Sequence, residues 1–184
     1  MSDTEGNPAA AAPAKKGPLD TLHFLLITSF GLGLSPFASG TVGTFGGVGL
    51  AVLIQALAGS GEAAFATALI GWGVAAVVLF AYGCSTSAYV KRTFPNDDPG
   101  AFVLDEVVGY LVTVAVYALL AGQLPDAVGH TAAFFAFRVF DVLKIQPAKM
   151  LEDLHGAFGI MADDQVAGAY AGVSIWLVLP LLGY

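Results

Sequence analysis

The stretch Ala127–Leu143, AVGHTAAFFAFRVFDVL, decides how this chain is threaded through a membrane. It is largely apolar, yet it carries His130, Arg138 and Asp141. If it and Phe45–Ala58 both cross the bilayer, every Lys and Arg of the chain falls on one side. The positive-inside rule makes that side cytoplasmic. If either stretch stays out of the membrane, the basic residues divide between two faces, so we expect both stretches to cross.

The composition indicates lipid as the solvent. Of 184 residues, 57% are hydrophobic and 11% are charged, and the mean hydropathy is +0.76. An ordinary soluble domain carries about 25% charged residues. The net charge of −7 argues against nucleic-acid binding, which needs clustered Lys and Arg. The single cysteine, Cys84, excludes an internal disulfide framework and any multi-cysteine metal site.

The apolar segments predict an all-α fold, a polytopic membrane helical bundle with about five membrane helices. A crossing helix needs about 20 apolar residues, or fewer where the bilayer is thin. The stretch Leu22–Leu34 would reach only about 20 Å as a helix, so we expect a short N-terminal interfacial or half-inserted helix. Residues 1–20 have no apolar periodicity and predict a disordered arm, which leaves 21–184 as one membrane-embedded domain. The predicted spans are 45–58, 63–82, 104–122, 127–143 and 166–182.

Five carboxylates border apolar helices on the predicted cytoplasmic side. Ionised groups in such places are costly and usually functional. The alternative is that they cap helix starts, where the backbone dipole favours an acid, but a cap needs one acid and no partner. Oxygen ligands favour Mg²⁺ over softer metals, so we expect at least three of the five to share a divalent cation. The five predicted ligands are Asp105, Glu106, Asp141, Asp163 and Asp164.

Arg138, Asp141 and Lys144 recur at a spacing of three residues. On a helix such residues lie along one face. A salt-bridge ladder on a solvated helix is the alternative, but the surrounding sequence, FFAFRVFDVLKI, makes a solvated face a poor fit. An arginine in that setting needs an anion, either Asp141 or a phosphate that it can grip with two hydrogen bonds. We therefore predict phosphate binding by Arg138 and Lys144.

The segment Gly31–Gly47 holds six glycines among small hydroxyl residues. Such a segment lets backbone N–H groups approach an anion, and a helix start just after it attracts phosphate. Glycine-mediated packing between membrane helices explains the pattern nearly as well, so both readings stay open. On the first reading Ser35, Thr41 and Thr44 bind phosphate.

The histidines have less definite roles. His155 is a candidate proton donor to a leaving alkoxide, with metal ligation or a place in a turn as the alternatives. His23 and His130 lie away from the acids in this threading, so we expect them to be structural.

Four blocks in this order resemble the phosphatidylglycerophosphatase A family of bacterial membrane enzymes, from about Leu22 to Gly172. The blocks are GLGLSPFASGTVGT (31–44), DEVVGY (105–110), FRVFDVLKIQP (137–147) and HGAFGIMADDQVAG (155–168). The resemblance implies Mg²⁺-dependent removal of the terminal phosphate of phosphatidylglycerophosphate, leaving phosphatidylglycerol. It also implies a bacterial cytoplasmic (inner) membrane location, and the positive-inside rule predicts an active site that faces the cytoplasm. The family's acidic pair falls on Asp105 and Glu106, its Arg–Asp–Lys helix on Arg138, Asp141 and Lys144, and its paired aspartates on Asp163 and Asp164.

We therefore expect a lipid phosphomonoester hydrolase whose catalytic acids are Asp105, Glu106, Asp141 and Asp164. One metal ion or two, and direct attack by water or an aspartyl-phosphate intermediate, stay open. The rival enzyme is a phosphatase for phosphatidate or a polyprenyl phosphate. The rival outside enzymes is a cation or proton transporter. Against the transporter, the acids gather at one face and the sequence shows no inverted repeat.

Overall fold

A computed structural model describes residues 17–96, 99–148, 150 and 157–184 of the chain. Every regular element in these ranges is helical, which confirms the all-α prediction. The α-helices are α1 Asp20–Ile27, α2 Ser39–Ala58, α3 Glu62–Ser85, α4 Ser87–Thr93, α5 Leu104–Ala121, α6 Ala127–Leu143 and α8 Ala157–Val178, and the 3₁₀ helices are η1 Leu32–Leu34 and η2 Leu179–Leu182.

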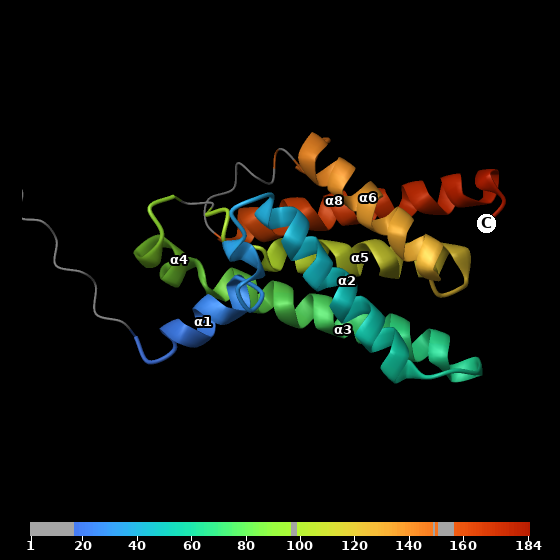
Figure 1. Ribbon diagram of the computed structural model, residues 1–184, viewed down its shortest axis with the longest axis horizontal. Coiled ribbons are helices and arrows are strands. Elements are labelled where there is room, and N and C mark those ends of the chain that lie inside the picture. The colour runs from blue at the N-terminus through green and yellow to red at the C-terminus, as the bar shows by residue number, and fades with distance from the viewer. Residues whose placement is uncertain (1–16, 97–98, 149, 151–156) are drawn as a thin grey trace, which may run out of the picture.

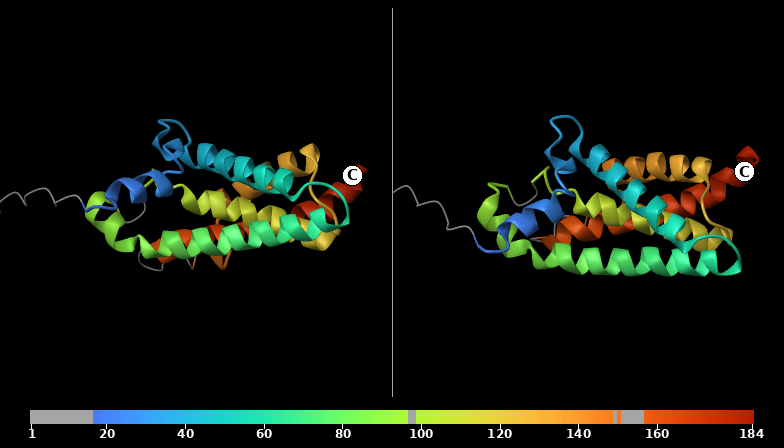
Figure 2. Two further views of the ribbon diagram at one scale, coloured as in Figure 1. Left: turned by 90° about the horizontal axis from the view of Figure 1, so that it is seen from below. Right: turned by 60° about the horizontal axis from the view of Figure 1, so that its bottom comes forward.

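The five long helices form an elongated bundle with α5 at its centre (Figures 1 and 2). Helix α5 contacts α2, α3, α6 and α8. Of its residues 61% are buried, against 17–33% in the most apolar 18-residue windows of α2, α3 and the α8–η2 segment, so the helices around it present broad apolar faces to the outside. An apolar outer surface of this extent is expected for helices that face lipid.

Among the described residues, four helical segments are long and apolar enough to cross a membrane: α2, α3, α5 and the α8–η2 segment. Helix α6 has 17 residues, which at 1.5 Å each give about 26 Å, slightly less than a hydrocarbon core of about 30 Å. It nevertheless returns beside α8 and α2 from the far end of α5 (Figure 1). The crossing of α6 as a fifth span stays a prediction.

Several helices are longer than the hydropathy pattern indicates. The predicted start of the first span at Phe45 was wrong, because α2 begins at Ser39 and includes the glycines from Gly40 onward. The predicted start of the last span at Val166 was also wrong. Helix α8 begins at Ala157, so Asp163 and Asp164 lie inside it and not before it. Polar residues end a hydropathic run, but a helix continues through them where neighbouring elements supply their partners.

The N-terminal part of the chain is built from α1 and η1, joined by a turn at Thr28–Gly31. Helix α1 ends at Ile27, after which Ser29 and Phe30 adopt left-handed φ angles of 46° and 57°. Most of the predicted arm lies outside the described residues. Asp20, at the first turn of α1, forms an ion pair with Arg92 of α4. Helix α4 was not predicted, because it is short and follows the Gly–Cys–Ser–Thr end of α3.

Polar side chains are joined by hydrogen bonds inside the bundle, toward the end where α2 ends and α6 begins. The Tyr110 hydroxyl lies 2.8 Å from Nδ1 of His130, and Nε2 of His130 lies 3.2 Å from Oε1 of Gln55. The Gln55 amide nitrogen donates to the carbonyl of Pro125 at 3.0 Å. This chain joins α2, α5, α6 and the loop before α6, and it gives His130 the structural role that we expected.

Helices α5 and α8 approach closely through glycine. A Cβ at Gly168 would overlap the carbonyl oxygen of Gly109, and a Cβ at Gly109 would lie 2.9 Å from the carbonyl oxygen of Asp164. Small residues allow membrane helices to pack backbone against backbone. Asp105 precedes Gly109 and Asp164 precedes Gly168 by four residues each, about one helical turn. The close contact therefore brings these two acids together.

We predict that Gly168→Val lowers the free energy of unfolding by about 1–3 kcal/mol, because the added carbons must displace backbone of α5. Thermal unfolding of the purified protein in detergent, followed by circular dichroism, measures the change. Gly73→Val in α3 is the control, since a Cβ there meets no atom within 4 Å among the described residues. Equal loss of stability in both variants would count against this packing.

Candidate active site

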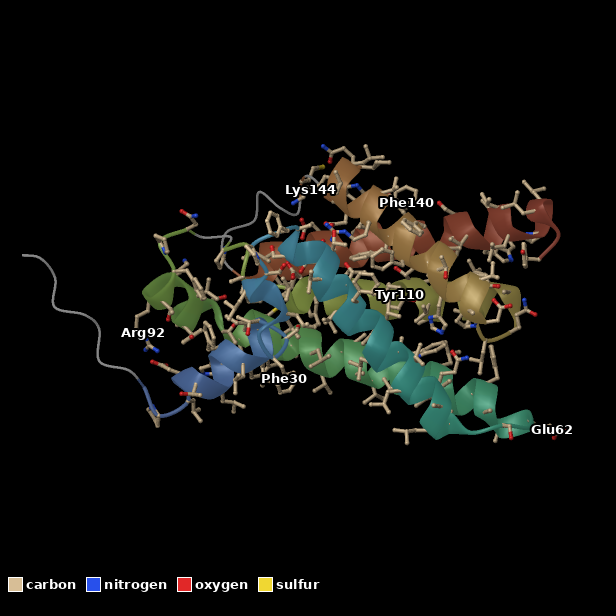
Figure 3. The ribbon with its side chains drawn as sticks, viewed as in Figure 1. Phe30, Glu62, Arg92, Tyr110, Phe140 and Lys144 are labelled. Carbon is tan, nitrogen blue, oxygen red and sulfur yellow. The ribbon has the colours of Figure 1, made fainter. Side chains whose placement is uncertain are left out.

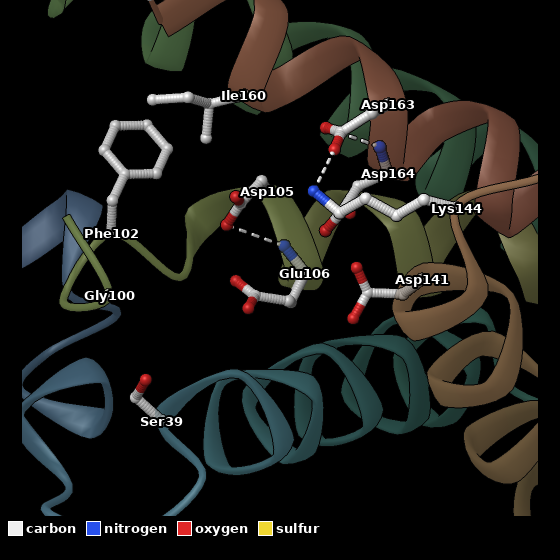
Figure 4. Close-up of a pocket in the computed structure, with 10 residues that line it drawn as sticks. All are labelled: Ser39, Gly100, Phe102, Asp105, Glu106, Asp141, Lys144, Ile160, Asp163 and Asp164. Atoms are coloured by element: carbon white, nitrogen blue, oxygen red, sulfur yellow. Dashed lines mark hydrogen bonds and ion pairs between the residues drawn. The ribbon is translucent and has the colours of Figure 1, made fainter. Parts of the chain in front are cut away.

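One pocket of about 200 Å³ lies where α2, α5, α6 and α8 meet at one end of the bundle (Figure 4). The five carboxylates predicted to lie on the cytoplasmic side all line it. Its walls come from the start of α2, the loop before α5, the first turn of α5, the end of α6 and the first turns of α8. The lining residues are Ser39, Gly100, Phe102, Asp105, Glu106, Asp141, Lys144, Ile160, Asp163 and Asp164.

Three of the acids form a compact cluster in this pocket. Asp105, Glu106 and Asp164 each present an oxygen, and these oxygens lie within 4.8 Å of one another. Asp105 and Asp164 are buried. Oδ1 of Asp105 accepts a hydrogen bond from the backbone N–H of Glu106 at 3.0 Å, which fixes the carboxylate at the start of α5. The three side chains and Asp141 point into a common space (Figure 4).

Two oxygens of the cluster lack the partners that buried oxygens need. Oε2 of Glu106 and Oδ2 of Asp164 are buried and have no hydrogen-bond partner among the described residues. Burying an acceptor without a partner is costly, and the cost is larger for an ionised group. A hard divalent cation takes carboxylate oxygens as ligands. Asp105, Glu106 and Asp164 therefore fit a metal ion.

The two other predicted ligands are already paired with basic residues. Oδ2 of Asp141 lies 2.6 Å from Nη1 of Arg138, one turn away on α6. Oδ2 of Asp163 accepts a hydrogen bond from Nζ of Lys144 at 3.0 Å. The five acids thus divide into two groups. Three form the cluster, and two are paired with basic side chains at its edge. Metal ligation by Asp141 and Asp163 stays a prediction.

Arg138 lies between α6, α2 and α5. Besides Asp141, its Nη1 lies 4.0 Å from Oε1 of Glu106 and donates to Oγ1 of Thr44 at 3.5 Å. The first turn of α2 approaches closely, since a Cβ at Gly40 would lie 3.1 Å from both terminal nitrogens of the guanidinium. The side chain is therefore held beside the cluster with its charge directed at the acids.

Lys144 reaches the pocket from just beyond α6. It adopts a left-handed φ of 45° at the end of that helix, and its amine turns toward Asp163 of α8. Arg138 and Asp141 thus lie on one face of α6, as their spacing predicts. The prediction of a shared helical face was wrong for Lys144, which contacts the acidic region from beyond the end of the helix.

The predicted hydroxyl ligands lie around the pocket and do not line it. The Ser35 hydroxyl donates to the carbonyl of Phe37 at 2.8 Å, in the turn before α2. Thr44 is buried and donates to the carbonyl of Gly40 at 2.8 Å. Thr41 lies in the first turn of α2, half-buried. Phosphate binding by these three residues stays a prediction.

The glycine-rich segment supports its alternative reading. Gly43 and Gly47 of α2 face α5 and the residues before it, where a Cβ would lie 2.6 Å from Val103 and 2.8 Å from Tyr110. These glycines serve helix packing. Sequence reasoning missed Ser39, which lines the pocket at the start of α2. Its place in the glycine-rich segment, just before Gly40, was the available signal. His155 lies outside the described residues.

Known proteins similar to this chain are named as lipid phosphatases. A family model described as phosphatidylglycerophosphatase A matches residues 25–179. A phosphatidylglycerophosphatase A of Haemophilus influenzae is 33% identical, over 95% of this chain and 96% of that protein. A putative phosphatidylinositol-3-phosphatase of Bacteroides thetaiotaomicron is 32% identical over 88% and 96%, and a phosphatidylglycerophosphatase A of Escherichia coli is 28% identical over 84% and 81%. No solved structure matches the chain.

We predict that Mg²⁺ or Mn²⁺ raises the thermal unfolding temperature of the detergent-solubilised protein. A ligand at 100 times its Kd stabilises a folded protein by about 2.7 kcal/mol. The rise should disappear in Asp164→Asn, which removes one carboxylate of the cluster. Glu62→Gln is the matched control, because Glu62 is exposed at the opposite end of the bundle (Figure 3). Equal rises in both variants would place the cation elsewhere.

Proposed function

The chain belongs to the phosphatidylglycerophosphatase A family, and we propose that it hydrolyses the terminal phosphomonoester of phosphatidylglycerophosphate with a bound Mg²⁺. The family makes it a lipid phosphatase, and the apolar helices fit association with a membrane. The products of the proposed reaction are phosphatidylglycerol and inorganic phosphate.

The observation that carries the proposal is the excess of acid in the pocket. Five carboxylates face two basic side chains there, and two buried carboxylate oxygens have no hydrogen-bond partner among the described residues. A site meant only for an anionic phosphate would not repel it with so many acids. Acids that hold a metal cation, with basic side chains beside them, would allow a phosphate to bind the cation and the basic side chains at the same time.

The residues divide by chemistry in this proposal. Asp105, Glu106 and Asp164 would hold the metal, and a bound divalent cation supplies positive charge that stabilises the charge developing on phosphoryl oxygens. Arg138 offers five N–H donors, more than its contacts with Asp141 and Thr44 use. It and Lys144 would hold the phosphoryl oxygens. The N–H groups at the start of α2, near Ser39, add a partial positive charge.

The paired acids would keep the basic groups in place before the phosphate arrives. Asp141 holds Arg138 by an i,i+3 ion pair, and Asp163 holds Lys144 across to α8. Each basic side chain thus has a fixed position and loses less rotamer entropy when a phosphate binds. A phosphate oxygen that replaces or joins the carboxylate keeps each cation partnered throughout.

The placement of the site at one end of the bundle supports a location at a membrane surface. Arg92 and Glu62 mark opposite ends of the bundle (Figure 3), and α4 with its basic residues Lys91 and Arg92 lies at the pocket end. Basic residues are favoured on the cytoplasmic side. We propose that the pocket faces the cytoplasm of a bacterial inner membrane.

The test is phosphate release from a panel of lipid phosphates in detergent micelles, with Mg²⁺ or with a chelator. We expect Mg²⁺-dependent release from phosphatidylglycerophosphate. Asp164→Asn should lower the rate by about 100-fold or more, because metal contributions reach several kcal/mol, while Asp126→Asn at the far end should retain it. If none of the lipid phosphates releases phosphate in a metal-dependent way, the proposal is refuted.

One relative's name favours a second candidate substrate. The Bacteroides thetaiotaomicron protein is named as a putative phosphatidylinositol-3-phosphatase, so the panel includes phosphatidylinositol 3-phosphate besides phosphatidate and a polyprenyl phosphate. Preferential release from one of these would retain the reaction and change the substrate.

A further inference from the structure

The segment between α1 and α2 carries an exposed apolar ridge, formed by Phe30, Leu34 and Phe37. Their exposed fractions are 78%, 54% and 82%, and Phe30 and Phe37 are the most exposed phenylalanines among the described residues. No charged residue occurs from Thr28 to Ala38. The segment projects sideways from the bundle beside the start of α2 (Figure 2). Three large apolar side chains on one projecting segment need an apolar partner.

Hydrogen bonds and close packing hold this segment in place. The carbonyl of Ile27 accepts a hydrogen bond from the backbone N–H of Val103 at 2.9 Å. The buried Thr28 hydroxyl donates to the carbonyl of Phe24 at 2.7 Å and accepts from the N–H of Gly31 at 3.1 Å. Gly33 packs directly against the carbonyl of Ala101. The segment is therefore fastened to residues 101–103, which lead into the first acids of α5.

The outward direction of the ridge is maintained against backbone strain. Phe30 has a left-handed φ of 57°, and Ala38, next to Phe37, has one of 46°. Such conformations are unfavourable for residues other than glycine by roughly 1 kcal/mol or more, and they persist where surrounding contacts impose them. Strain of this kind is common at ligand contacts.

The last residue of the ridge, Phe37, lies close to the pocket along the chain. It stands two residues before Ser39, and Ser39 and Gly100 both line the pocket. A Cβ at Gly100 would lie 3.7 Å from the Ser39 hydroxyl, so the segment before α2 and the loop before α5 meet there. A molecule with its phosphate in the pocket and a long apolar part outside would pass this edge.

We propose that the apolar ridge contacts the hydrocarbon chains of the lipid whose phosphate occupies the pocket, so that the protein selects its substrate by its tails as well as by its phosphate. The inference rests on the proposed lipid phosphatase function. The ridge continues the outward apolar face of α2, where Phe45 and Leu53 are 58% and 54% exposed. This continuity, together with the absence of charge, favours acyl chains over a protein partner.

The experiment compares one head group on two tails. The substrates are phosphatidylglycerophosphate with two oleoyl chains in mixed micelles and the same lipid with two hexanoyl chains, dissolved as monomers. The variant Leu34→Asn/Phe37→Asn changes two ridge residues that are not in the left-handed conformation. Leu181→Asn is the control, because Leu181 is 84% exposed at the opposite end, past the end of α8.

We expect the double variant to lower kcat/KM for the dioleoyl substrate about tenfold, through loss of apolar contact area. For the dihexanoyl substrate the change should stay within about twofold, and Leu181→Asn should change neither. Equal losses on both substrates, or no loss on either, would overturn the inference. If the wild-type protein releases phosphate from neither substrate, the proposed function fails instead.

A second measurement does not depend on turnover. Dioleoyl phosphatidylglycerophosphate with a photoactivatable diazirine in one acyl chain is bound to the wild-type protein without Mg²⁺, irradiated, and the labelled peptides are identified by mass spectrometry. Label within residues 28–38, displaced by excess unlabelled lipid, supports the contact. Label confined to the outer faces of α2 and α3 would overturn it.

Discussion

The backbone contact between Gly109 of α5 and Gly168 of α8 sets the geometry on which the pocket depends. Each glycine lies one turn after an acid of the cluster, so the approach of the two helices determines the distance between Asp105 and Asp164. A side chain at either glycine would separate the helices and widen the cluster. Helix packing and the spacing of the acids are therefore one constraint.

That constraint gathers negative charge at one end of an apolar helical bundle, and the rest of the site compensates for it. Arg138 of α6 neutralises Asp141, and Lys144, the residue after α6, neutralises Asp163 of α8. The three clustered carboxylates are left with a charge that a divalent cation can largely offset. Helix α6 matters for this reason more than for its contribution to the core. It supplies both the guanidinium and Asp141, and the Tyr110–His130–Gln55 hydrogen bonds hold it against α5 and α2.

The elements predicted best were those whose pattern is local. Long apolar runs gave the spans near 63–82 and 104–122 to within a few residues of α3 and α5. The starts of α2 and α8 were missed, because glycine and paired aspartates end a hydropathic run while the helix continues. Asp163 is tolerated within α8 because Lys144, 19 residues earlier, supplies a partner. Such a partner is visible only in the folded protein.

The sequence by itself determined the helical class, an apolar composition that suits a membrane, the family resemblance and the acidic and basic residues that gather at one end. The family resemblance rests on four blocks of sequence, and the others follow from composition, from the length of apolar runs and from the charge bias between loops. The tertiary structure alone decided which acids cluster and which are paired, and that Ser39 and not Ser35 lines the pocket. It also decided that Phe30, Leu34 and Phe37 are exposed in the segment that leads to the pocket residue Ser39. The physical reason is that distances among α2, α5, α6 and α8 are set by glycine contacts and hydrogen bonds between residues far apart in the chain.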